Sequence, residues 1–132
     1  MSSAIQGVPV SKKRLWAGRV ISALPVLLLL FSGVMKLMKP APVLQGFARY
    51  GYSESLIPVI GILEIASTLI YAIPQTSMLG AILLVGYLGG ATATNVRIGD
   101  PSWVMTVILG VLAWVGLYLR DDRLKALVPG RR

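Results

Sequence analysis

Long apolar runs separated by short polar segments dominate the chain. Four of them cover residues 17–38, 56–74, 78–96 and 102–119. Each is near the roughly 20 residues that a helix needs to cross about 30 Å of hydrocarbon. Because lipid offers no partner for backbone polar groups, a spanning segment of this kind must be helical. The pattern predicts an all-α fold, a four-helix bundle of transmembrane helices over residues 17–119, between a flexible basic N-terminal tail (1–16) and a basic C-terminal tail (120–132).

The first apolar run follows three cations, as the apolar part of a signal peptide does. The run is too long for a signal peptide, and no small-residue cleavage pattern follows it. We therefore expect a retained helix.

The segment after this run has a pattern of its own. Val43, Leu44, Phe47 and Tyr50 recur at helical spacing, and Gly51 follows them. One interpretation is a short amphipathic helix on the outer surface that covers part of the bundle. The other is an interfacial loop whose apolar side chains dip into lipid.

Composition and charge agree with a protein of the lipid bilayer. Hydrophobic residues make up 55% of the chain and charged residues only 14%, while the net charge is +8. Nine of the 13 Lys and Arg residues lie before or at the start of the first run or after the last one. The positive-inside rule then places both termini in the cytoplasm, as an even number of spans requires. We expect a multi-pass protein of the cytoplasmic (inner) membrane that does not bind nucleic acid.

Missing residue types exclude several kinds of chemistry. The chain has no cysteine and no histidine, so thiol exchange and the usual ligands of haem, copper and zinc are lacking. No phosphate-binding glycine loop is present, because the clustered glycines lie inside an apolar run. We expect no metal, no haem and no catalytic residues.

Glu64 is the residue that most strongly indicates a site, because it lies near the middle of the second apolar run. Ionisable groups within a membrane are rare and usually face a protein interior. Side chains lean toward the N-terminus of their helix, so Glu64 leans outward while Lys36 and Arg97, on helices of opposite direction, lean inward. Tyr87 and Asn95 are close enough in depth to join them. We predict a polar cluster in the outer half of the bundle.

Three interpretations of this cluster stay open. Glu64 and a cation could simply hold the helices together. They could form a ligand or proton site, or Glu64 could be protonated and contact lipid or a second copy of the chain. Lys36 could also extend to the headgroups, and Arg97 could pair with Asp100 in a loop.

Small residues predict where helices pack closely. Gly86, Gly90 and Ala93 share one face of the third run, which leads to Arg97. Gly33 and Gly61 lie on the polar stripes of the first and second runs. Small residues at such spacing let membrane helices approach closely, so we expect a neighbouring helix against each of these faces.

Several short motifs together resemble one family. They are SGVMKL at residues 32–37, GILE at 61–64, GYLGGA at 86–91, Arg97, and WVGLYLR at 114–120. In order and spacing this chain, from about residue 19 to 129, is similar to the DoxX-like family of small bacterial membrane proteins. The resemblance implies a four-helix membrane bundle with polar motif positions at Lys36, Glu64 and Arg97. Many members have histidine where this chain has Asn95, so a proton-relay or metal role is not expected there.

The family takes its name from a subunit associated with a thiosulfate:quinone oxidoreductase. The resemblance therefore favours a non-catalytic membrane subunit or scaffold whose cluster binds a quinone-like or other small ligand, with a redox protein or a second copy of the chain as partner. The alternative is a small proton-coupled exporter that uses Glu64. A third possibility, an enzyme for a lipid-soluble substrate, would have one carboxylate as its main catalytic group.

Overall fold

The computed structural model describes residues 12–121, and within them the secondary structure is helical, without strands. The all-α prediction is confirmed for this part of the chain. The helices are α2 (Lys12–Met38), α3 (Ala41–Tyr50), α4 (Leu56–Ala72), the 3₁₀ turn η1 (Pro74–Thr76), α5 (Ser77–Arg97) and α6 (Trp103–Arg120).

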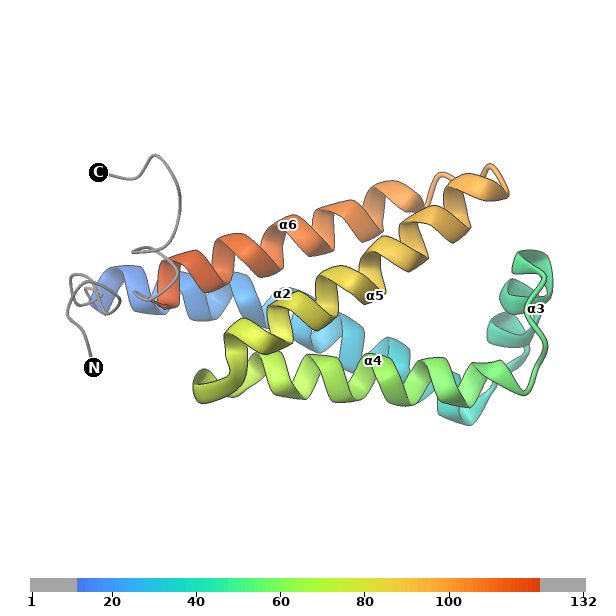
Figure 1. Ribbon diagram of the computed structural model, residues 1–132, viewed down its shortest axis with the longest axis horizontal. Coiled ribbons are helices and arrows are strands. Elements are labelled where there is room, and N and C mark those ends of the chain that lie inside the picture. Colours follow the sequence, from blue (N-terminus) through green and yellow to red (C-terminus); the bar gives the residue numbers. More distant parts are fainter. Residues whose placement is uncertain (1–11, 122–132) are drawn as a thin grey trace.

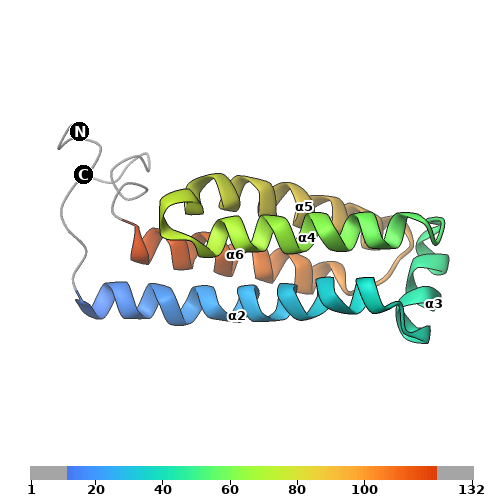
Figure 2. The same cartoon turned by 90° about the horizontal axis from the view of Figure 1, so that it is seen from below.

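Four long helices lie side by side, and the short helix α3 lies across one end of them (Figures 1 and 2). Helix α2 contacts α4 and α6, and α5 contacts the same two helices, so each long helix has two neighbours. The start of α2, the turn η1 and the end of α6 lie at the end opposite α3. We call the two ends the α3 end and the η1 end.

Within residues 12–121, three helical segments are long and apolar enough to cross a membrane: α2, α6 and the segment Pro74–Arg97 that contains α5. Helix α4 is also apolar but has only 17 residues. The sequence predicted an apolar run to residue 74, but the helix ends at Ala72, since a residue before proline is driven toward extended backbone, as Ile73 is. Large apolar side chains cover the outside of the bundle, for example Leu27 and Phe31 at 65% and 66% exposure.

The largest other difference from the predicted helix bounds is at the start of the first long helix. Helix α2 begins at Lys12, so residues 12–16 are helical rather than part of a tail. The rest of the predicted tails, residues 1–11 and 122–132, lies outside the described residues. Of the two interpretations of the segment after α2, the structure has the short helix, α3. It is capped by Gly51, whose φ of 85° is the left-handed conformation that glycine adopts without strain.

At the η1 end the helices touch through glycine. A Cβ on Gly18 would lie 2.6 Å from the Arg120 backbone nitrogen, and one on Gly116 would lie 2.9 Å from that of Ser22. Gly80 of α5 fits in the same way against the backbone of Tyr71. Such close approaches need glycine, and they pack this end of the bundle tightly.

Tyr71 is the centre of a polar network at the same end. Its side chain is fully buried, and its hydroxyl donates to the Ala113 carbonyl at 2.5 Å and shares a 3.0 Å hydrogen bond with Ser22 Oγ. Arg120 donates to the Tyr71 carbonyl at 2.9 Å and lies over its ring. These bonds join α4 to its neighbour α2 and, across the bundle, to α6.

Candidate functional site

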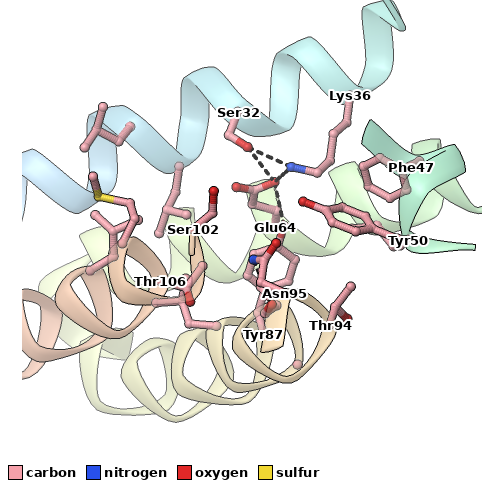
Figure 3. Close-up of a pocket in the computed structure, with 18 of the residues that line it drawn as sticks. Ser32, Lys36, Phe47, Tyr50, Glu64, Tyr87, Thr94, Asn95, Ser102 and Thr106 are labelled. Carbon is pink, nitrogen blue, oxygen red and sulfur yellow. Dashed lines mark hydrogen bonds and ion pairs between the residues drawn. The ribbon is translucent and has the colours of Figure 1, made fainter. Parts of the chain in front are cut away.

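A cavity of about 650 Å³ lies within the bundle toward the α3 end. Figure 1 shows α5 and α6 diverging from α2 and α4 in this direction, and Figure 3 shows the side chains that surround the space. Its volume is in the range of small-molecule sites. The polar residues in its lining are Ser32, Lys36, Tyr50, Tyr52, Glu64, Tyr87, Thr94, Asn95, Ser102 and Thr106.

Glu64 is the buried charge of this cavity, with only 1% of its surface exposed. Its Oε1 atom accepts hydrogen bonds from Lys36 Nζ at 2.8 Å, from the Tyr87 hydroxyl at 3.0 Å and from Ser32 Oγ at 3.4 Å. Lys36 Nζ also donates to Ser32 Oγ at 2.7 Å. Three helices therefore meet at one carboxylate oxygen (Figure 3), and the structure brings together Glu64, Lys36 and Tyr87 as the sequence predicted.

Close packing between α2 and α4 next to Lys36 and Glu64 explains how the two side chains come within hydrogen-bonding distance. A Cβ on Gly33 would lie 2.5 Å from Ile65 Cγ1, and one on Gly61 would lie 2.9 Å from Lys36 Cβ. The two glycines thus let α2 and α4 approach closely beside the ion pair, in agreement with the predicted packing role of Gly33 and Gly61.

The charges in the cavity balance locally. The side chain of Lys36 is 13% exposed and that of Glu64 is 1% exposed, so both are largely shielded from solvent. A buried ion pair is tolerated only when good geometry and further hydrogen bonds offset the desolvation, and Tyr87 and Ser32 supply those bonds. The cluster therefore presents polar groups but little net charge to the cavity.

Asn95 lies in the wall formed by α5, and only 5% of its surface is exposed. Its Nδ2 donates to the Ala91 carbonyl at 3.0 Å, while Oδ1 has no partner among the described residues. The bond to Ala91 also fixes which amide atom is which, because a flipped amide would place two acceptors together. Asn95 therefore joins the cavity, as predicted, with an unsatisfied acceptor.

Arg97 does not join the cluster. It is exposed and donates to the Tyr50 carbonyl, which ties the end of α5 to α3. Nor does it form the alternative loop pair with Asp100. That carboxylate accepts from the Ser102 amide at 2.8 Å and lies 3.3 Å from Arg49, and these interactions, the Ser102 hydrogen bonds foremost, lower the pKa of Asp100.

The small residues of α5 also differ from the prediction. No atom lies within 4 Å of the place where a Cβ would stand on Gly86 or Gly90, and Ala93 is exposed. Gly86 and Gly90 instead belong to the cavity lining. The structure thus does not place this face against a neighbouring helix, and its lack of side chains helps to create the space.

An aromatic group near the α3 end was not identified from the sequence as part of the site. The rings of Phe47, Tyr50 and Tyr52 have centroids 5.5–6.0 Å apart, and all three residues line the cavity. Lys36 Nζ is 6.0 Å from the centre of the Phe47 ring. Helical spacing pointed to Phe47 and Tyr50 as one face of α3, but Tyr52 follows the terminating glycine and carries no such signal.

Comparison with known proteins agrees with this architecture. The profile of the DoxX-like family matches residues 20–116, which include the cavity-lining residues of α2, α4, α5 and α6. No curated protein and no solved structure gives a significant match. The matched region and the long apolar helices make this chain an integral membrane protein, and it belongs to the DoxX-like family.

Proposed function

We propose that this protein is a non-catalytic membrane subunit or scaffold that holds a small lipid-soluble molecule with a quinone-like or other small polar head. The observation that carries the proposal is the cavity of about 650 Å³ with the Lys36–Glu64 pair in its wall. Its remaining lining is largely apolar or aromatic, which suits the body of such a molecule. A redox protein or a second copy of the chain is the proposed partner.

Two glycines of α5 allow the binding to be tested with a matched control. Gly90→Leu would place a larger side chain at the cavity wall, and its Cβ would meet no other atom within 4 Å. Gly89→Leu is the control, because Gly89 has equally open surroundings but does not line the cavity. Both changes replace a helical glycine by a better helix former.

The measurement is mass spectrometry of lipophilic molecules extracted from the purified protein. We expect one compound in stoichiometric amount with the wild-type protein and with Gly89→Leu, and its loss with Gly90→Leu. Equal amounts in both variants, or only bulk lipid in all three proteins, would contradict the proposal.

We further propose that α4 is a fourth transmembrane span. The protein would then lie in the cytoplasmic membrane with both termini on the cytoplasmic side. Helix α4 runs alongside the three longer helices, and its 17 residues reach the lower limit for a span. The chain has no cysteine, so single cysteines can report topology. Ser53→Cys, at the α3 end, should react with an impermeant maleimide added outside the cell, and Gln75→Cys, in η1, should not. The reverse pattern would overturn the orientation.

The packing supports a subunit more than a proton-coupled exporter. An exporter needs its site to open to both sides in turn, whereas glycine contacts at Gly18, Gly80 and Gly116 pack the η1 end tightly. Glu64 Oε1 also accepts hydrogen bonds from three donors on α2 and α5, which hold the carboxylate in one place. Proton-linked efflux by the purified protein in vesicles, abolished in Glu64→Gln, would reverse this preference.

A further inference from the structure

Asn95 Oδ1 is the one cavity acceptor that is buried and unpartnered among the described residues. Buried amide oxygens almost always accept a hydrogen bond, and one that does not carries a large desolvation penalty. Because Nδ2 is held by the Ala91 carbonyl, the amide cannot turn to relieve this. A bound molecule that donates a hydrogen bond here would remove the penalty.

Several donors of the cavity lining are held by partners other than Asn95. Lys36, Tyr87 and Ser32 all donate to Glu64 Oε1. The Thr94 hydroxyl pairs with Tyr52 and that of Thr106 with Thr92. No donor of the lining reaches Asn95 Oδ1 in this structure, so a donor on a ligand would be its first partner among the described residues.

Charge and shape narrow the ligand class further. Lys36 and Glu64 neutralise each other, so a charged head would be buried without a counter-ion. Tyr87, Phe47, Tyr50 and Tyr52 offer ring surfaces to the cavity, and rings pair favourably with a flat aromatic body. A neutral aromatic hydroxyl meets both requirements.

We infer that the cavity selects a lipid-soluble phenol-type molecule whose hydroxyl donates to Asn95 Oδ1. The inference rests on the proposed function and sharpens it, because it distinguishes two kinds of polar head. A hydroquinone or other phenol can donate this bond. A quinone carbonyl only accepts hydrogen bonds and would leave Asn95 unsatisfied.

The test compares 4-nonylphenol with its methyl ether 4-nonylanisole, in which a methyl group replaces the donor hydrogen; a steric effect of this methyl group would persist in Asn95→Leu. Their binding is measured by native mass spectrometry on the full chain in nanodiscs, for the wild type, Asn95→Leu and the control Gln75→Leu. Leucine keeps the shape of asparagine and favours a helix, and Gln75 is an exposed amide at the η1 end. Comparing the phenol-to-ether affinity ratio between proteins cancels the unequal partition of the probes into lipid.

We expect the wild type and Gln75→Leu to prefer the phenol by about tenfold, the effect of one satisfied buried hydrogen bond. In Asn95→Leu the preference should fall to about one while the ether still binds. Equal binding of both probes to the wild type, or a preference that persists in Asn95→Leu, would overturn the inference and leave the proposed cavity function intact. Failure of both probes to bind any of the proteins would overturn the inference and count against the proposed function itself.

Discussion

Removal of Lys36 tests whether the buried ion pair is a standing contact. Lys36 Nζ lies 2.8 Å from Glu64 Oε1, a separation at which two charges attract by about 6 kcal/mol at an effective dielectric of about 20. Desolvation offsets much of this, and breaking a buried pair by removing one partner costs roughly 3–5 kcal/mol. Tyr87 and Ser32 still donate to Glu64 in Lys36→Met. We therefore expect a loss near the lower limit, about 3 kcal/mol in the free energy of unfolding.

The double variant separates the ion pair from general packing. In Lys36→Met with Glu64→Gln no charge remains buried, and the Gln amide oxygen can accept the same two hydrogen bonds. This protein should lose only about half as much stability as Lys36→Met alone. Glu64→Gln alone should cost less than Lys36→Met, because Lys36 is 13% exposed and its long side chain can extend to the headgroups.

The assay is reversible unfolding in mixed micelles of a mild detergent and dodecyl sulfate, followed by circular dichroism. Lys12→Met, an exposed cation at the η1 end, is the control and should change stability by no more than about 0.5 kcal/mol. If the losses of the two single variants simply add in the double variant, Lys36 and Glu64 are not coupled and the ion-pair argument fails.

Three other predictions concern separate parts of the fold. Gly33→Ala should lower the free energy of unfolding by about 1–3 kcal/mol in the same assay, because its Cβ would lie 2.5 Å from Ile65 Cγ1; an unchanged stability would mean that α2 and α4 are farther apart. Tyr71→Phe loses two buried hydrogen bonds at the η1 end and should cost about 1–2 kcal/mol there, whereas no loss would show that they contribute nothing. Asp100 has a lowered pKa because the Ser102 amide donates to it, so its stabilisation is complete above its ordinary value of 3.8 and is lost as the pH falls through the lower folded value. Amide-exchange protection of the 98–102 loop should therefore fall in acid, and Asp100→Asn should remove that dependence.

The sequence predicted the long helices and a polar cluster around Glu64 in which either Lys36 or Arg97 could be the partner, and the structure shows Lys36 in that place. Side-chain lean and helix direction are set by backbone geometry, so two charged groups on antiparallel neighbours could be paired without knowing the packing. The same argument also placed Arg97 in the cluster around Glu64, and there it was wrong. It lies in the last turn of α5, near the backbone of α3, and the Tyr50 carbonyl offers it a nearer partner than Glu64 does.

The faces of α5 could not be assigned in advance. In a membrane protein both the lipid side and the packed side of a helix are apolar, so a stripe of small residues does not tell contact from open space. Gly80 packs against a neighbour while Gly86 and Gly90 face a cavity, although all three are glycines of one helix. The end of α3 could be expected from Gly51, which acts through local backbone sterics, whereas α4 stops two residues before the predicted residue 74.

One end of the bundle is closely packed and the other contains the cavity, and this difference affects the side of the membrane from which a ligand can enter. The η1 end is packed through glycine and the Tyr71 network, while the cavity lies toward the α3 end. A guest molecule that entered this cavity from the lipid beside it would come from the leaflet at the α3 end, so the occupancy of the cavity would follow the concentration of that molecule in this leaflet. The protein would then report on, or store from, that leaflet alone, and a steep difference in guest concentration between the leaflets would neither drive transport through it nor be dissipated by it.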